Sequence, residues 1–187
     1  DDGYESQTLA AKGGLNLPAN IRLDTSLLWS DAESEYDSYA FGAQGSVADG
    51  DEVSNSETLS GNISLKIPLL EGRLENLVQI GYADIERENV SNGVQSYFTE
   101  GDRVLYRYQG TLAINDANTL AFGAEHEETS ANEQDSSIDS LFALYEFKPV
   151  EDLTLTGGLR VDDHETFGSE TTGRVAAAWT ATEHVTF

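Results

Sequence analysis

The sequence predicts an all-β protein, an antiparallel up-and-down transmembrane β-barrel, and three observations point to it. Apolar and polar residues alternate with a period of two along all 187 residues, whereas the i, i+3, i+4 spacing of amphipathic helices is hard to find. Several alternating segments are near or beyond ten residues, the length with which a tilted strand crosses an apolar layer of about 25–30 Å. Short turns alternate with longer polar loops, the rhythm of a chain that passes up and down through a slab.

The first three predicted strands show the alternation most clearly. In residues 9–17 the odd-numbered positions are Leu, Ala or Gly, and in residues 21–30 Ile21, Leu23, Leu27 and Trp29 share one side. Residues 59–67 are the cleanest example, since every odd position is Leu, Ile or Gly and the even positions are Ser60, Asn62, Ser64 and Lys66. One side of each strand is therefore suited to an apolar environment and the other to water.

The later strands continue the pattern. They are predicted around residues 74–85, 103–114, 119–127, 138–147, 153–162 and 172–180, and a tenth begins at Val185. In residues 153–162, Leu153, Leu155 and Leu159 oppose Thr154, Thr156 and Arg160. The stretch SLFALYEF, residues 140–147, is ambiguous because both of its sides are apolar.

The connections between these strands fall into two kinds. Short turns are expected at residues 18–20, 68–73, 115–118, 149–152 and 181–184. Longer polar loops are expected at about residues 37–57, 88–102, 128–137 and 163–171, which are rich in Gly, Ser, Asn and Asp.

A soluble β-sandwich is the alternative for any alternating all-β sequence. It predicts strands of about 5–6 residues with turn signals about every 8–12 residues, yet no pair of turn residues interrupts residues 21–36. Arg103, Arg107 and Gln109 share the side of their strand that faces away from Tyr106 and Tyr108. Buried in a sandwich core, such charges would each cost several kcal/mol unless paired, whereas a water-filled lumen tolerates them. The pattern favours barrel strands whose alternating leucines face lipid.

Composition narrows the classes of function. The chain carries 10 Lys+Arg against 34 Asp+Glu, a net charge of −24, which repels nucleic acid. Cysteine is absent, no apolar run approaches the ~18 residues of a spanning helix, and no nucleotide-binding or G-x-S-x-G motif occurs. His126, His164 and His184 are far apart in the sequence, which disfavours a zinc site. We therefore expect no enzymatic activity.

Because the chain has neither an initial Met nor a signal peptide, we expect it to be a piece of a longer product.

Three segments carry a resemblance to a known family. Residues 153–187, LTLTGGLRVDDHETFGSETTGRVAAAWTATEHVTF, resemble barrel strands of TonB-dependent outer-membrane receptors. DDGYESQTL (residues 1–9) and EYDSY (residues 35–39) look like early extracellular hairpins of the branch that transports cobalamin, vitamin B12. The likeness extends over the whole chain, as one segment of a barrel.

The resemblance implies a 22-stranded barrel closed around an N-terminal plug domain. Residues 1–187 would be a partial barrel domain of about nine or ten strands, without the plug and the C-terminal strands. The implied function is TonB-dependent active transport of a scarce small molecule, cobalamin or a ferric siderophore, across the outer membrane of a Gram-negative bacterium. Outer-membrane lipid and the TonB complex, reached through the plug, are the implied partners. The lumen residues Arg103, Arg107, Gln109 and Arg160 would line the plug.

The resemblance also implies calcium sites in the early extracellular loops, and no other cofactor. By residue match, Asp2, Tyr36 and Asp37 correspond to calcium-site positions in the cobalamin branch, and Asp49 and Asp51 correspond approximately. Calcium takes six to eight oxygen ligands, mostly carboxylate and carbonyl, from flexible loops. The alternative is that these are solvated carboxylates in a very acidic chain.

Two other hypotheses stay open at this point. One is a soluble extracellular β-sandwich that acts as an adhesion or carbohydrate-binding module, which should be monodisperse without detergent. The other is a small closed barrel with a structural role or an outer-membrane enzyme, which would lack a plug domain upstream of Asp1.

Overall fold

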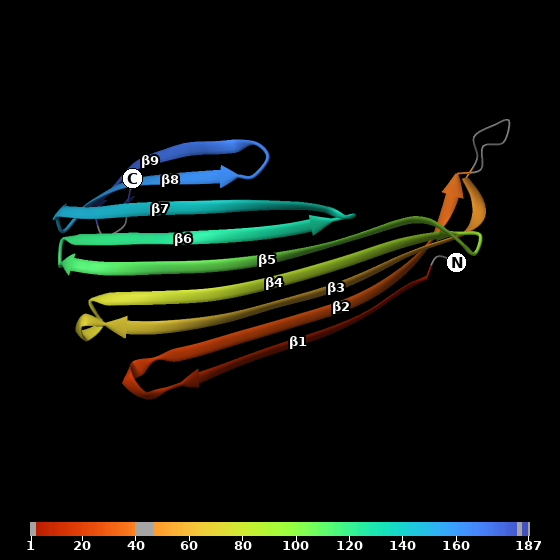
Figure 1. The fold of residues 1–187 in the computed structure, drawn as a ribbon, viewed down its shortest axis with the longest axis horizontal. Coiled ribbons are helices and arrows are strands. Elements are labelled where there is room, and N and C mark those ends of the chain that lie inside the picture. The colour runs from red at the N-terminus through yellow and green to blue at the C-terminus, as the bar shows by residue number, and fades with distance from the viewer. Residues whose placement is uncertain (1–2, 40–46, 183–184, 187) are drawn as a thin grey trace.

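In the computed structural model, the chain forms one antiparallel sheet whose strands follow each other in sequence order (Figure 1). The structure describes residues 3–39, 47–182 and 185–186. Within these ranges there are ten strands: β1 (Tyr4–Asn16), β2 (Arg22–Tyr39), β3 (Val47–Leu69), β4 (Leu74–Ser91), β5 (Val94–Asn115), β6 (Asn118–Ala131), β7 (Gln134–Val150), β8 (Leu153–His164), β9 (Gly168–Thr182) and β10 (Val185–Thr186). Two 3₁₀ turns, η1 (Pro18–Asn20) and η2 (Leu70–Gly72), connect β1 to β2 and β3 to β4. Among these residues no helix has the length and apolarity to cross a membrane.

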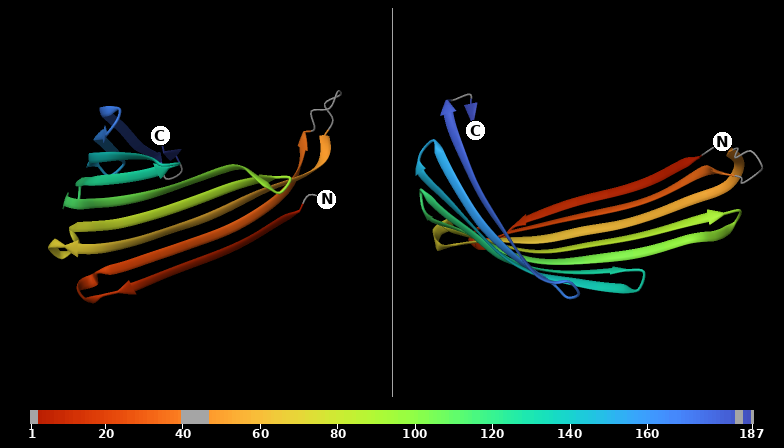
Figure 2. Two further views of the ribbon diagram at one scale, coloured as in Figure 1. Left: turned by 45° about the vertical axis from the view of Figure 1, so that its right-hand side comes forward. Right: turned by 90° about the horizontal axis from the view of Figure 1, so that it is seen from above.

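The sheet is long, twisted and strongly curved (Figure 2). The connections after β1, β3, β5 and β7 lie at one end, and the hairpin tips after β4, β6 and β8 lie at the other (Figure 1). The right-handed twist of each strand accumulates from strand to strand, which bends so wide a sheet out of a plane. The predicted up-and-down order of an all-β antiparallel fold is therefore confirmed.

The predicted long loops are wrong, because most of their residues continue the strands. Residues 88–102 form a hairpin in which β4 and β5 are joined only by Asn92 and Gly93. These two residues have φ of 50° and 75°, the positive values that a two-residue type I′ turn requires. Asn-Gly is a strong hairpin signal, and the sequence interpretation overlooked it.

The same correction applies to the other predicted loops. Residues 128–137 close through Asn132 and Glu133, again with positive φ, and residues 163–171 leave only 165–167 outside the strands. Within residues 37–57, β3 already begins at Val47. Strands that extend beyond an apolar layer have water on both sides, so polar residues on both sides are compatible with an unbroken backbone ladder.

Strand register assigns each residue to one of two faces, because residues directly opposite each other in an antiparallel pair lie on the same side. One row across the sheet reads Leu65, Val78, Tyr108, Ala124, Leu141 and Val161. The adjacent row reads Ser64, Gln79, Arg107, Glu125, Ser140 and Asp162. We call the side of the first row the apolar face and the side of the second row the polar face.

The register resolves the ambiguous stretch in β7. Leu141 and Tyr145 pair with Ala124 and Leu120 on the apolar face, which places Phe142 on the polar face. Its ring occupies the space above a glycine of the neighbouring strand, since a Cβ added to Gly123 would lie 2.5 Å from the Phe142 ring. Phe142 thus fills a gap beside Gly123, a role that the residues of β7 alone do not reveal.

The described residues form no hydrophobic core. None of their apolar side chains is buried, and exposed ones include Ile63 at 55% and Leu159 at 66%. A sandwich buries the inner faces of two packed sheets, whereas the described strands form one sheet. The sandwich alternative is therefore excluded for the described part of the chain, and its alternating leucines lie on an open surface.

Two strand glycines give a matched test of this packing. We expect Gly123→Ala to lower the free energy of unfolding by about 1–3 kcal/mol, because the new methyl group overlaps Phe142 and the backbone oxygen of Tyr108. Gly157→Ala should be neutral or stabilising by up to about 1 kcal/mol, because nothing lies within 4 Å of its Cβ position. Urea unfolding of the receptor that contains this chain measures both variants, and equal losses would contradict this packing.

Candidate functional site on the polar face

The positive charges of this acidic chain gather on the polar face. The chain has ten Lys and Arg residues. By register, eight of them belong to strand positions on the polar face: Lys12, Arg22, Lys66, Arg87, Arg103, Arg107, Arg160 and Arg174. The other two, Arg73 and Lys148, lie beside short connections. The apolar face of the strands therefore carries no Lys or Arg, as expected for a surface that avoids the desolvation of cations.

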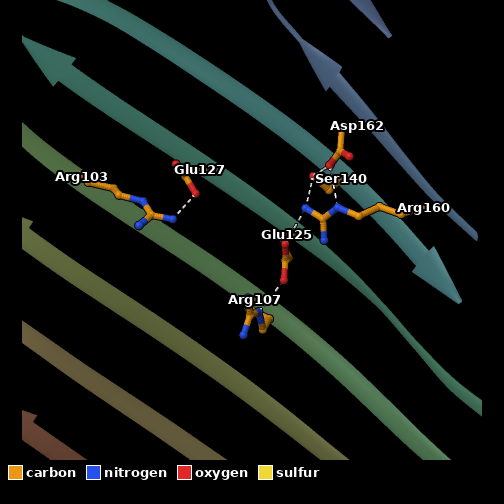
Figure 3. Close-up of polar contacts among 7 residues, drawn as sticks. All are labelled: Arg103, Arg107, Glu125, Glu127, Ser140, Arg160 and Asp162. Atoms are coloured by element: carbon orange, nitrogen blue, oxygen red, sulfur yellow. Dashed lines mark hydrogen bonds and ion pairs between the residues drawn. The ribbon is translucent and has the colours of Figure 1, made fainter. Parts of the chain in front are cut away.

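A network of ion pairs crosses strands β5 to β8 on this face (Figure 3). Glu125 on β6 lies at its centre. One carboxylate oxygen, Oε1, is 2.5 Å from Arg107 Nε on β5, and the other, Oε2, is 2.8 Å from Arg160 Nη2 on β8. The Arg107 contact is an ion pair whose angle departs from that of a hydrogen bond. One carboxylate thus joins two arginines from strands that are not adjacent.

The network continues to Ser140 and Asp162. Ser140 Oγ donates a hydrogen bond to Asp162 Oδ1 at 2.5 Å and accepts one from Arg160 Nη2 at 2.8 Å. Arg160 Nε also donates to Asp162 Oδ1, at 2.7 Å. Ser140 is only 4% exposed, so its hydroxyl depends on these partners in place of water. Arg160 is therefore held from two sides, by Glu125 and by Asp162.

A second pair on the same face is more open to solvent. Arg103 Nη2 lies 2.5 Å from Glu127 Oε2, with side-chain exposures of 54% and 27%. Glu125 is only 11% exposed, beside Arg107 at 35% and Arg160 at 38%. Because water screens exposed charges, we expect that removing the charge of Glu125 costs more stability than removing that of Glu127.

The four residues expected to line the lumen lie on one face of the sheet, and their contact with a plug stays a prediction. Arg103, Arg107 and Gln109 on β5 and Arg160 on β8 share the polar face. The sequence interpretation missed Glu125 as their partner. Alternation along β6 places Glu125 and its neighbour His126 on different faces, which the sequence alone indicates. The pairing of Glu125 with Arg107, however, depends on the register between β5 and β6.

Three of the proposed calcium residues belong to the β2–β3 hairpin. Tyr36 on β2 pairs with Glu52 on β3 and so lies on the polar face, whereas Asp51, the neighbour of Glu52, lies on the other face. Asp37 falls where the register between the two strands shifts. Asp2 lies outside the described residues, and so does the side chain of Asp49. Within the described part of the chain, no three His, Asp or Glu side chains are arranged to hold a metal ion. The calcium site stays a prediction.

The histidines are separated in the structure. His126, at a position that belongs to the apolar face, contacts Asp139 through Nδ1 at 2.7 Å and Glu128 through Nε2 at 3.1 Å. His164 Nε2 lies 3.1 Å from Ser136 Oγ near the tip of the β8–β9 hairpin, and His184 lies outside the described residues.

Comparisons with known proteins agree with one another on the type of domain. The family model described as TonB dependent receptor-like, beta-barrel matches residues 1–187. A vitamin B12 transporter, BtuB of Photobacterium profundum, is 22% identical over 194 residues, which cover 99% of this chain and 30% of the transporter. The chain therefore spans less than a third of that relative.

Solved structures of siderophore receptors have the same fold. A mutant of the ferric enterobactin receptor PfeA from Pseudomonas aeruginosa superimposes with a TM-score of 0.78 at 15% identity, covering 99% of this chain and 32% of the receptor. The siderophore receptor PirA from Acinetobacter baumannii gives 0.75 at 10% identity, covering 97% and 32%. At such low identities the likeness concerns the fold alone.

Proposed function

Because the chain belongs to the β-barrel domain family of TonB-dependent receptors, we propose that it is part of a barrel that takes up cobalamin or a ferric siderophore by active transport. The observation that carries the proposal is the family match over all of residues 1–187. As a member of this family, the chain is located in the outer membrane of a Gram-negative bacterium. Binding followed by gated passage needs no covalent chemistry, so the proposal assigns no catalytic residue.

The two faces of the sheet support different partners. The apolar face, with exposed Ile63, Leu159 and Val78, is suited to lipid chains, because no other part of the described chain covers these residues. The polar face, with its cations and the Glu125 network, is suited to the lumen. A plug domain within the lumen would connect the barrel to the TonB complex.

Uptake by whole cells tests this function. The receptor that contains this chain is expressed in Gram-negative cells that lack their own cobalamin and siderophore receptors. We expect it to accumulate labelled cyanocobalamin or a labelled ferric siderophore, and we expect deletion of tonB to abolish accumulation. Uptake that continues without TonB would contradict active transport, and absence of uptake of either class would contradict the proposed substrates.

Calcium binding to the β2–β3 hairpin is a separate expectation from the family resemblance. Calorimetry on the complete receptor should detect Ca²⁺ binding, with a Kd on the order of 10⁻⁴–10⁻³ M for an extracellular module. Asp37→Asn and Asp51→Asn should each weaken binding, because each removes a charged oxygen ligand. Asp163→Asn, on the distant strand β8, is the matched control. Equal heats from all three variants would contradict a site in this hairpin.

A further inference from the structure

Asn92 and Gly93 form the tip of the β4–β5 hairpin, at the same end of the sheet as the tips after β6 and β8 (Figure 1). Both residues are exposed, and nothing lies within 4 Å of the position that a Cβ of Gly93 would take. The Gly93 N–H forms no hydrogen bond in the part of the chain that the structure describes. The backbone nitrogen that follows Asn92 is therefore uncrowded and unbonded.

The side-chain amide of Asn92 is held by one weak contact. Its Nδ2 donates a hydrogen bond to Ser91 Oγ at 3.3 Å, which is long for such a bond. Ser91 Oγ itself donates to Glu52 Oε1 at 2.7 Å. Among the described residues, no donor lies within hydrogen-bond distance of Asn92 Oδ1. The amide can therefore rotate about the Cβ–Cγ bond with the loss of a single hydrogen bond.

The β6–β7 tip has the same backbone with a different environment. Asn132 and Glu133 also have positive φ, of 50° and 64°. Asn132 Oδ1, however, accepts hydrogen bonds from Thr99 Oγ1 at 2.9 Å and from the backbone N–H of Glu100 at 3.2 Å. In addition, the residue that follows Asn132 carries a side chain. The two tips thus compare a loosely held Asn before Gly with a fixed Asn before Glu.

We propose that Asn92 is a site of spontaneous deamidation and isomerisation, with water as the co-reactant. The Gly93 nitrogen, after losing its proton to a base in solution, attacks Asn92 Cγ. The N–Cγ bond forms, the Cγ–Nδ2 bond breaks, and Nδ2 takes up a proton and leaves as ammonia. The product is a five-membered cyclic imide.

Water then opens this imide in one of two ways. Cleavage of the new N–Cγ bond leaves aspartate at position 92. Cleavage between the same nitrogen and the backbone carbonyl carbon of residue 92 leaves isoaspartate, in which the chain continues through Cγ. One water is consumed and one ammonia is released in either case, so the reaction needs no oxidant or reductant.

The hairpin tip provides the two conditions for this reaction. Ring closure requires the backbone of Asn92 to rotate out of its turn conformation, so the tip must open locally. Exposed tips open at a much lower free energy than the strands behind them. Because Gly93 has no Cβ, its nitrogen also approaches Cγ without steric hindrance. Asn92 is therefore expected to react faster than Asn132.

Conversion would change the tip in two respects. It adds a carboxylate close to Glu52, the acceptor of the Ser91 hydroxyl. Isoaspartate also adds one backbone carbon to a two-residue turn, whose length fixes the register of the hairpin. We expect the hydrogen bond from Asn92 N to the Asp51 carbonyl oxygen, 2.8 Å long, to be lost, which loosens the attachment of this tip to β3.

Mass spectrometry of peptides from the complete receptor tests the proposal. The receptor is incubated in lipid vesicles in neutral and mildly alkaline buffers made with oxygen-18 water. We expect Asn92 to convert at least about tenfold faster than Asn132, a barrier lower by about 1.4 kcal/mol. Each converted residue should contain oxygen-18, and an isoaspartate-specific methyltransferase should label part of the product. Conversion should be faster in the alkaline buffer, because the attacking nitrogen must lose its proton.

A substitution at the neighbouring residue examines the cause. Gly93→Ala should slow conversion of Asn92 by about tenfold, because the methyl group hinders the attack. Unchanged or faster conversion in this variant would contradict attack by the residue 93 nitrogen. The comparison of Asn92 with Asn132 within one molecule needs no variant, so it is independent of any strain that Ala introduces at the positive φ of position 93.

Two further results would overturn the proposal. One is conversion of Asn92 no faster than that of Asn132. The other is conversion of Asn92 only after the receptor has been unfolded in urea, because the reaction is assigned to the folded hairpin. Hydrogen exchange of the incubated receptor measures the structural effect: exchange should become faster at the β4–β5 tip and stay unchanged at the β6–β7 tip. Equal exchange at the β4–β5 tip before and after conversion would contradict the loss of the bond to Asp51.

Discussion

Val78→Arg is expected to lower the free energy of unfolding of the membrane-inserted barrel by about 2–4 kcal/mol, the cost of an arginine near the middle of the lipid-facing band. Val78 is 43% exposed on the apolar face of β4, with Leu65 and Tyr108 directly opposite. If lipid chains are its neighbours, a guanidinium there must lose its hydration or distort the bilayer. Denaturant unfolding of the complete receptor in lipid vesicles measures the change.

The adjacent residue provides the control for this prediction. Gln79 belongs to the polar face, directly opposite Arg107. We expect Gln79→Arg to change stability by less than about 1 kcal/mol, since a lumenal side chain retains access to water and only the repulsion from Arg107 is added. A loss for Val78→Arg no larger than for Gln79→Arg would contradict the assignment of the apolar face to lipid. A soluble protein would tolerate an arginine at the exposed Val78.

Glu125→Gln is expected to lower the free energy of unfolding by about 1–3 kcal/mol. The substitution retains the shape of the side chain but leaves Arg107 and Arg160 without their shared charge. The loss should be smaller than for a fully buried pair because both arginines are about one third exposed. Denaturant unfolding in the same lipid vesicles measures this loss of free energy. The loss should depend little on salt, because the Glu125 carboxylate is only 11% exposed.

Glu127→Gln, two residues away on the same strand and face, is the matched control. Its one pair, with Arg103, is more exposed, so we expect a loss of about 0–1 kcal/mol that salt reduces further. Equal losses at Glu125 and Glu127 would show that the bridging position of Glu125 contributes nothing beyond an ordinary surface pair.

The sequence by itself determined the fold class and the two-sided character of the strands. Side chains alternate along any strand, so the period-two pattern of residues 59–67 or 153–162 assigns neighbours to opposite faces without knowledge of the partners. The same local rule grouped Arg103, Arg107 and Gln109 on one side of β5, as the structure confirms. The acidic composition and the absence of nucleotide or nucleophile motifs are equally local properties.

The tertiary structure alone decided the features that depend on register. The face of Phe142, the pairing of Glu125 with Arg107, and the hydrogen bond from Ser140 to Asp162 each require knowing which residue of the next strand lies opposite. Backbone pairing also showed that polar residues such as 88–102 extend a hairpin instead of forming a loop. These features depend on pairs of residues that are far apart in the chain. A shift of one strand by a single residue would exchange its faces while leaving its own sequence pattern intact, so the pattern of one strand does not specify its partners.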